Sequence, residues 1–200
     1  MKEYNLEGFE RGLFELGITL SEEQKTQFLQ YYELLVEWNS FMNLTAITEF
    51  DQVITKHFLD SLSLVKVCDV EQAGRILDVG TGAGFPGIPL KIAFPEVEVV
   101  LLDSLNKRVK FLNEVIGQLG LSKITAVHGR AENFARQKDY REQFDLAEEK
   151  TDGSPFRYHR NGCLRMAVLQ LLRLAQHSEL YPAAGRHDSG ACLLHEQRGL

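Results

Sequence analysis

The sequence predicts an α/β fold, in which a parallel β-sheet with helical connections follows a helical N-terminal segment. Apolar residues recur at helical spacing from Leu6 to about Trp38 and again up to about Val67. From Arg75, short runs rich in apolar and β-branched residues alternate with helical stretches. This alternation is typical of parallel sheets, because a crossover between parallel strands needs room for a helix. The 200 residues suit one ordinary domain with an appendage.

Capping signals divide the helical segment. Gly17 is expected to end the first helix, and Ser21 with Gln24 three residues later forms a capping box that begins the second. Residues 39–43 break the pattern, and Thr48 opens a third helical stretch. Residues 1–70 are therefore predicted to be a helical N-terminal segment.

Residues 71–146 are predicted to form a Rossmann-like core that binds a cofactor. Strands are expected at 75–79, 97–103, 124–128 and 143–146. Helices are expected from about Ile88 to Ala93, where Pro95 blocks extension, and from about Asn106 to Gly120.

The composition changes after Leu146. Residues 147–200 contain no isoleucine and one valine, yet they hold six of the twelve arginines and four of the six histidines. A helical pattern spans 164–176, but no later strand can be recognised, so the later strands of the sheet are expected to be missing. We interpret 147–200 as an atypical tail, either disordered or encoded by an out-of-frame or otherwise altered coding end.

Charge and cysteine content exclude several classes of protein. With 22 basic and 28 acidic residues the net charge is −6, so any contact with nucleic acid must be a local patch. The three cysteines, Cys68, Cys163 and Cys192, are too far apart for a metal cluster and indicate no disulfide framework. Without an apolar run of ~18 residues or a signal peptide, the chain is expected to be soluble and cytoplasmic.

A glycine-rich loop after the first strand is the strongest chemical signal. Gly80, Gly82 and Gly84 let the backbone turn sharply and approach a ligand closely. The loop lacks the Gly-Lys-Ser/Thr ending of a phosphate-binding P-loop and the glycine spacing of a dinucleotide fingerprint, so the expected ligand has no diphosphate. Asp78 either contacts this ligand or only orders the loop.

Two further loops are expected at the same edge of the sheet. Asp103 ends the second strand nineteen residues after Gly84, where an acidic side chain accepts hydrogen bonds from ribose hydroxyls. Residues 129–132 follow the third strand. Together the three loops predict an adenosine-containing ligand such as S-adenosylmethionine. Asp103 as a turn residue, or Glu132 as a first-turn helix carboxylate, remains the structural alternative.

The chain resembles the bacterial 16S ribosomal RNA (guanine-N7) methyltransferase family known as RsmG or GidB, over residues 1 to about 146. The resemblance is carried by LLVEWNSFMNLTAITEFDQVITKHFLDSL, by ILDVGTGAGFPGIPLKIAFPEVEVVLLDSLNKRVKFL and by HGRAENFA. It implies a class I methyltransferase fold, S-adenosylmethionine as cofactor, and 16S rRNA or the small ribosomal subunit as partner of a monomer. Family contacts to the cofactor fall on Gly80, Phe85, Ala131 and Glu132, to which the loop and ribose arguments add Thr81, Gly82, Gly84 and Asp103. Where the family has a cofactor-contacting arginine, this chain has Lys150.

The implied reaction needs no general base, since N7 of neutral guanine carries no proton, so catalysis rests on proximity and alignment. No catalytic residue is assigned; His57 is a weak candidate, with a structural role as the alternative, and Phe85 is either a stacking or a core aromatic. The predicted RNA-binding residues are Lys56, Lys107, Arg108 and Lys110, with Lys66 and Lys91 as further candidates and a solvated helix face as the alternative. Two other functions stay open: methylation of another substrate, and an inactive remnant that binds cofactor weakly.

Overall fold

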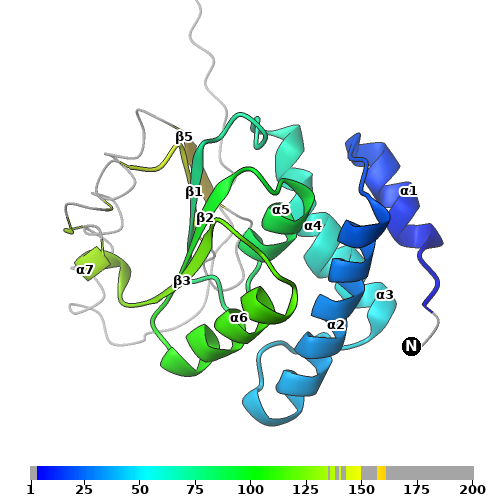
Figure 1. The fold of residues 1–200 in the computed structure, drawn as a ribbon, viewed down its shortest axis with the longest axis horizontal. Helices are drawn as coiled ribbons and strands as arrows, with labels where there is room; N and C mark the ends of the chain where they lie inside the picture. Colours follow the sequence, from blue (N-terminus) through cyan, green and yellow to red (C-terminus); the bar gives the residue numbers. More distant parts are fainter. Residues whose placement is uncertain (1–3, 135, 138–139, 141–142, 150–156, 161–200) are drawn as a thin grey trace, which may run out of the picture.

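A computed structural model describes residues 4–134, 136–137, 140, 143–149 and 157–160, and these residues contain a five-stranded sheet in the order β3-β2-β1-β4-β5 (Figure 1). The strands are β1 (Arg75–Val79), β2 (Glu98–Asp103), β3 (Ile124–His128), β4 (Leu146–Glu149) and β5 (Arg157–Arg160). The first four strands pair in parallel, as predicted, and β5 pairs with β4 in the antiparallel direction. The α/β fold with a parallel sheet is therefore confirmed.

The predicted position of the fourth strand was wrong by three residues: it begins at Leu146, whereas the sequence pattern placed it at 143–146. Asp145 explains the shift. Its backbone N–H donates to the Arg75 carbonyl at 2.9 Å, and its Oδ2 accepts from the Arg75 N–H at 3.0 Å. The side chain of Asp145 thus occupies the start of β1, and ladder pairing begins one residue later, with Leu146 opposite Ile76.

The expectation of no strand after Leu146 was also wrong, because β4 extends to Glu149 and β5 follows it. In the ladder Leu146 stands opposite Arg160, and Glu149 stands opposite Arg157. Backbone hydrogen bonds to the free edge of β4 define this strand, so its sequence, Arg-Tyr-His-Arg, needs no apolar run. The predicted helix at 164–176 and the Lys150 position lie outside the described residues.

The helical N-terminal segment consists of α1 (Glu7–Leu16), α2 (Glu22–Met42) and a continuous stretch from Phe50 to Lys66. That stretch is made of α3 (Phe50–Val53), the π-helix η1 (Ile54–Leu59), α4 (Asp60–Leu62) and the 3-10 helix η2 (Ser63–Lys66). Gly17 ends α1 in the left-handed conformation, and the capping box of Ser21 and Gln24 is present. Helix α2 continues through the expected break at 39 and ends at Met42, with Asn43, whose φ is 52°, as its C-cap. The capping signals are therefore confirmed.

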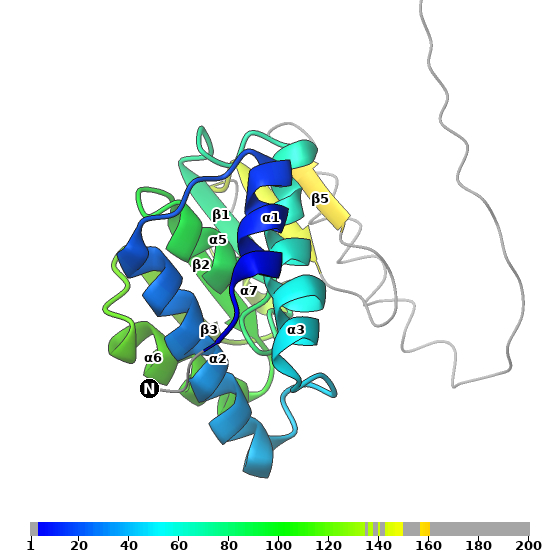
Figure 2. The same ribbon diagram turned by 90° about the vertical axis from the view of Figure 1, so that its right-hand side faces the viewer.

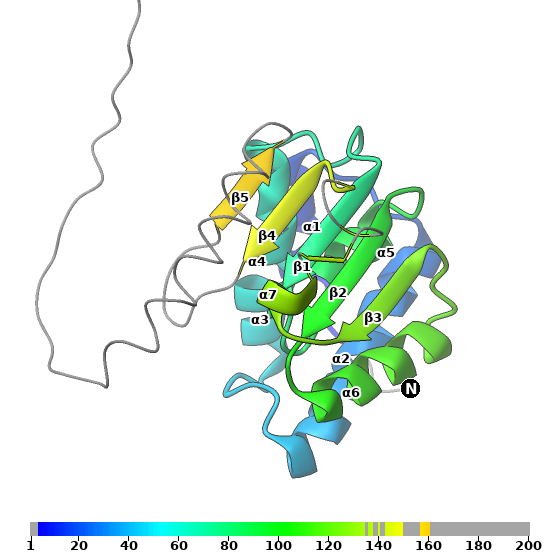
Figure 3. The ribbon, with the colours of Figure 1, turned by 90° about the vertical axis from the view of Figure 1, so that its left-hand side faces the viewer.

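Helices lie on both faces of the sheet. Helices α5 (Gly87–Ala93) and α6 (Asn106–Gln118), backed by the N-terminal helices, lie on one face, and α7 (Ala131–Phe134) lies on the other (Figures 1 and 3). Seen from the helical side, α1 and α2 lie in front of the sheet (Figure 2). Strand alternation explains the division: Ile76 and Leu101 join the helical core, whereas Leu77 and Val100 join a smaller cluster on the opposite face. The helical segment and the sheet therefore share one core.

Lys91 was wrongly expected to be a candidate for RNA contact, because its side chain is 1% exposed. It lies on α5, and its Nζ donates to the carbonyls of Pro95 and Val97 at 2.7 and 2.6 Å. The amino group thereby ties the end of α5 to the start of β2. Burial lowers the pKa of Lys91 from 10.5 to about 8.

This lowered pKa predicts how stability depends on pH. Between about pH 8 and pH 10.5 the unfolded chain binds more protons at Lys91 than the folded protein does. Below this window Lys91 is charged in the folded protein, and burying that charge lowers the free energy of unfolding. As pH rises through the window the buried amine loses its proton, and this destabilisation disappears. In urea unfolding, the free energy of unfolding should rise across the window by up to about 1.4 kcal/mol per pH unit, relative to a Lys91→Met variant. Equal pH slopes for the two proteins would contradict this assignment.

Candidate functional site

The glycine-rich loop follows β1 at the carboxyl edge of the sheet. Gly80, Gly82 and Gly84 have φ values of 70°, 62° and 98°, which lie in the left-handed region. The backbone N–H groups of Gly80 and Thr81 both donate to the Leu102 carbonyl, at 2.8 and 3.2 Å. The loop is thus bound to the end of β2, and its conformation requires the glycines that the sequence places there.

Asp78 orders this loop from within the core. It is 0% exposed, and its Oδ2 accepts from the Thr81 hydroxyl at 2.7 Å and from the Gly87 N–H at 2.9 Å. Thr81 precedes Gly82 and Gly87 follows Gly84, so one carboxyl group holds both ends of the segment that contains these two glycines. Of the two roles left open for Asp78, this geometry favours ordering the loop.

The helical segment supports the same loop from behind. The Tyr31 hydroxyl donates to the Ala83 carbonyl at 2.5 Å, and burial raises the pKa of Tyr31 well above 10, with the nearby Asp78 adding to the shift. The phenol therefore stays protonated and keeps donating. Sequence reasoning missed Tyr31, because its place on the apolar face of α2 is what any core aromatic shows.

His57 and Phe85 form a stacked pair between the helical segment and the loop. Their ring centroids are 4.4 Å apart with an interplanar angle of 13°, and Phe85 is 3% exposed. His57 lies in the π-helix η1, and its Nε2 is 3.0 Å from the Thr45 hydroxyl. This packing favours the core alternative for Phe85 and the structural alternative for His57.

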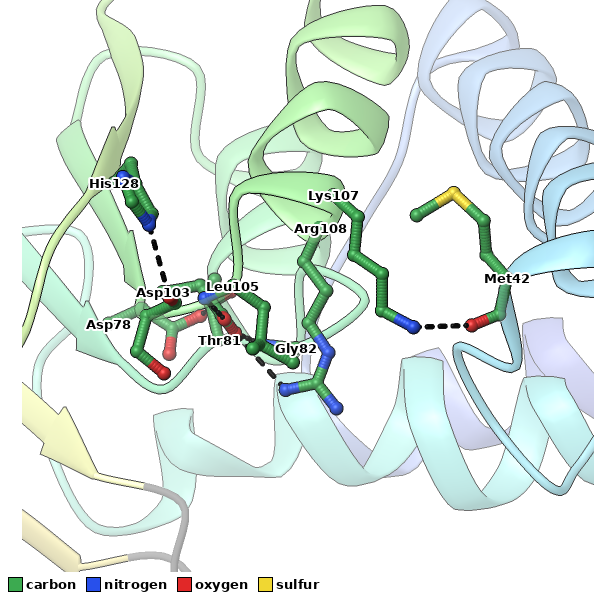
Figure 4. Close-up of polar contacts among 10 residues, drawn as sticks. Met42, Asp78, Thr81, Gly82, Asp103, Leu105, Lys107, Arg108 and His128 are labelled. Carbon is green, nitrogen blue, oxygen red and sulfur yellow. Dashed lines mark hydrogen bonds and ion pairs between the residues drawn. The ribbon is translucent and has the colours of Figure 1, made fainter.

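Asp103, at the end of β2, is 2% exposed and lies beside the glycine loop. Its Oδ1 accepts from the Leu105 N–H at 2.8 Å, and its Oδ2 accepts from the Gly82 N–H at 3.0 Å. The same Oδ2 lies 3.4 Å from Nη1 of Arg108, which reaches across the loop from α6 (Figure 4). The structure thus brings a predicted cofactor residue and a predicted RNA residue into one ion pair.

A pocket of about 320 Å³ opens at the carboxyl ends of β1, β2 and β3. Its lining includes three of the predicted cofactor residues, Gly80, Ala131 and Glu132. The remaining lining residues are Val79, Leu102, Ser104, Gly129 and Arg130. Asp103 stands between two lining residues in the sequence, whereas the buried side chains of Thr81 and Phe85 point elsewhere. The volume is in the range of small-ligand sites, at about 300–1,000 Å³.

The predicted RNA-binding cations differ in their surroundings. Lys107 donates to the Met42 carbonyl at the end of α2, at 3.2 Å (Figure 4), and Lys56 donates to Gln52 Oε1 at 3.4 Å. Lys110 is exposed on α6, and Lys66 donates to the Glu15 carbonyl at the end of α1, at 2.7 Å.

Two exposed apolar residues belong to the segments that Lys107 joins, and sequence reasoning missed both. Phe41 is 65% exposed and precedes Met42, and Leu105 is 42% exposed and precedes α6. In the sequence Phe41 fits the helical period of α2, so only the structure shows that it projects from the protein. Lysine ammonium groups and exposed apolar side chains therefore occur together near the end of α2 and the start of α6. We call Phe41, Leu105, Lys107 and Lys110 the edge patch.

Within the described residues, no group of His, Cys, Asp and Glu side chains could hold a metal ion. The same part of the chain has no helix of the length and apolarity that a bilayer crossing requires.

A mainly parallel sheet with a glycine loop, a strand-end carboxylate and a pocket at its carboxyl edge is the arrangement of α/β proteins in which ligands bind at the carboxyl ends of the strands. The family described as "GidB: rRNA small subunit methyltransferase G" matches residues 24–148. The chain belongs to this family, as the sequence resemblance predicted, and the match ends two residues beyond the compositional break at 146.

Curated relatives agree with this assignment. Over 138 residues the chain is 62% identical to "Ribosomal RNA small subunit methyltransferase G" of Lachnoclostridium phytofermentans, covering 69% of this chain and 57% of the relative. It is 53% identical over 147 residues to the protein of the same name in Thermoanaerobacter sp. (strain X514), covering 74% of this chain and 61% of the relative. The chain thus spans about 60% of the length of these relatives. Among solved structures, the SAH-bound methyltransferase PaMTH1 of Podospora anserina has a TM-score of 0.46 and 15% identity, over 76% of this chain and 60% of that chain.

Proposed function

We propose that this protein transfers a methyl group from S-adenosylmethionine to N7 of a guanine in 16S ribosomal RNA. The observation that carries the proposal is the pocket formed by three loops at one edge of the sheet, in a chain that belongs to a family described as rRNA small subunit methyltransferase G. Action in the cytoplasm, where ribosomes are assembled, and as a monomer are part of the proposal.

The residues of the site fit the nucleoside part of the cofactor. Gly80 and Gly129 contribute no side chain to the pocket wall, and Asp103, between the lining residues Leu102 and Ser104, offers carboxylate oxygens for ribose hydroxyls. Ala131 and Glu132 begin α7 and form the opposite wall. When bound, the cofactor would supply an electrophilic methyl group on a sulfonium ion.

Positioning, rather than proton transfer, is the task left to the protein. The lone pair of guanine N7 carries no proton at neutral pH, so the reaction requires alignment of N7 with the methyl group. Asp78, Tyr31 and the stacked pair of His57 and Phe85 all hold the glycine loop in place. We assign His57 a positioning role through Phe85, in agreement with the absence of any need for a base.

The edge patch is the proposed approach for the RNA. Lys107 and Lys110 offer positive charge to phosphates, with Lys56 and Arg108 as the other predicted contacts, and Phe41 offers an exposed ring on which an unstacked base could stack. Lys107 ties α6 to the end of α2, so the two helices present these groups together. A net charge of −6 makes such a local patch, not bulk attraction, the source of affinity.

Cofactor binding is the first test of this function. Calorimetric titration with S-adenosylhomocysteine, which has no transferable methyl group, should show one site on the wild-type protein. An Asp103→Asn variant should bind about tenfold more weakly, because one charge-assisted acceptor for the ribose is lost. Unchanged affinity in the variant would contradict the role of Asp103, and no binding to either protein would contradict cofactor use.

Methyl transfer is the second test. Small ribosomal subunits that lack the modification would be incubated with the full chain and S-adenosylmethionine labelled in its methyl group. The proposal expects labelled 7-methylguanosine after nuclease digestion of the 16S rRNA. Cofactor binding without transfer would favour the inactive-remnant alternative, and transfer to a different acceptor would favour the other-substrate alternative.

A further inference from the structure

Arg108 contacts the carboxyl group that the cofactor is proposed to use. The Asp103 side chain is 1% exposed, whereas that of Arg108 is 33% exposed, so Arg108 is the solvent-accessible partner of this ion pair. Nε of Arg108 is buried and has no hydrogen-bond partner among the described residues. The contact is thus a partial one, in which one guanidinium nitrogen reaches Asp103 at 3.4 Å while Nε is left without a partner among the described residues.

The hydrogen-bonding capacity of Asp103 indicates which contact a ligand would replace. A carboxylate accepts about four hydrogen bonds, and backbone N–H groups of Leu105 and Gly82 already take two of these positions, at 2.8 and 3.0 Å. Both backbone donors are fixed by the fold. The Arg108 contact, at 3.4 Å, is long for a hydrogen bond and involves a flexible side chain. Two ribose hydroxyls therefore find room at Asp103 most readily if Arg108 withdraws.

We propose that Arg108 exchanges partners, pairing with Asp103 in the free protein and with an RNA phosphate once the cofactor occupies the pocket. This inference rests on the proposed function and adds a coupling between the two ligands. Binding of the cofactor releases a cation, and the released cation adds to the affinity for RNA. By thermodynamic linkage, RNA must then raise the affinity for the cofactor by the same factor.

The neighbours of Arg108 support the direction of this exchange. Lys107 precedes it and points to Met42 on the opposite side (Figure 4). Lys110 is exposed further along α6, three residues after Lys107. A guanidinium released from Asp103 would add a third positive charge to those of Lys107 and Lys110 in the first turns of the helix. Arginine also binds phosphate in a bidentate manner, which a lysine at this position would not do.

The test uses the full chain, S-adenosylhomocysteine and purified small ribosomal subunits. In wild type, saturating S-adenosylhomocysteine should strengthen sedimentation binding to the subunits by about two- to fivefold, the range expected for a partly exposed ion pair. An Arg108→Gln variant should bind S-adenosylhomocysteine about two- to fivefold more tightly in calorimetry, because no side chain competes for Asp103. Its binding to the subunits should no longer respond to S-adenosylhomocysteine.

Lys110→Gln is the matched control, because it removes one positive charge from the same helix without touching Asp103. Its affinity for S-adenosylhomocysteine should equal that of wild type, and its coupling factor should persist. If Arg108→Gln binds S-adenosylhomocysteine no more tightly than wild type, or keeps the coupling, the exchange is refuted while the proposed function stands. If wild type binds no S-adenosylhomocysteine, the proposed function fails and the inference fails with it.

Discussion

An Asp78→Ala variant should lose about 2–5 kcal/mol of unfolding free energy, because two buried donors lose their acceptor. The Thr81 hydroxyl and the Gly87 N–H both donate to Oδ2 of this side chain. A buried donor without an acceptor costs about 1–3 kcal/mol. Urea unfolding followed by the fluorescence of Trp38, the single tryptophan, measures the loss. The ring centroids of Trp38 and Phe111 are 5.6 Å apart, so unfolding changes the surroundings of the indole.

Asp69→Ala is the control for this variant. Asp69 also accepts a backbone hydrogen bond, from the Gln72 N–H at 3.2 Å, but it is exposed. Water replaces that acceptor after mutation, so we expect a loss below about 1 kcal/mol. Similar unfolding midpoints for the two variants would show that Asp78 does not hold the loop. Calorimetry with S-adenosylhomocysteine should in addition show weaker binding for Asp78→Ala, because the loop that lines the pocket is no longer ordered.

A Gly84→Ala variant should be destabilised by about 2–4 kcal/mol, through backbone strain and steric overlap together. The φ of this residue is 98°, and a Cβ would stand 2.5 Å from Ile88 Cδ1 and 2.8 Å from the Tyr31 hydroxyl. The Ile88 and Tyr31 side chains are both buried and have little room to move. Tyr31 also holds the loop at Ala83, so we expect S-adenosylhomocysteine affinity to fall along with stability.

The same substitution elsewhere should have the opposite sign. Gly117 lies inside α6, and a Cβ there would meet no atom within 4 Å. Gly117→Ala should therefore raise the unfolding free energy by about 0.5–1 kcal/mol, since alanine loses less backbone entropy in a helix. Thermal unfolding of both variants would check the pair. A stabilised Gly84→Ala protein would contradict the proposed requirement for glycine in the loop.

Local patterns predicted most of the elements. Strands β1 and β3 have the predicted bounds, and the capping signals at Gly17 and Ser21 are present. The beginning of β4 was not predictable in this way, because it depends on Asp145 meeting Arg75, seventy residues away in the sequence. Strand β5 likewise exists through backbone pairing with β4, which side-chain periodicity does not report.

The candidate site likewise has features that local sequence patterns predicted and features that only the packing of helices on the sheet revealed. Glycine spacing and the strand-end position of Asp103 pointed to a nucleoside ligand, and the pocket lies where these signals meet. The support that Tyr31 gives to the loop, the exposure of Phe41 and the burial of Lys91 depend on how helices pack on the sheet. For each of these side chains, the neighbouring residues in the sequence are compatible with either a buried or an exposed position.

The sequence by itself determined the order of the main helices and of the four parallel strands, the glycine loop and the family of this chain, because these follow from neighbouring residues along the backbone. Only the tertiary structure decided that the Gly82 N–H and the Arg108 guanidinium meet the carboxylate of Asp103. It also decided that the buried ammonium group of Lys91 donates to two backbone carbonyls. The physical reason is distance in the chain. Contacts between segments are chosen by packing and by the satisfaction of buried polar groups, and no local pattern encodes which partner a side chain will find.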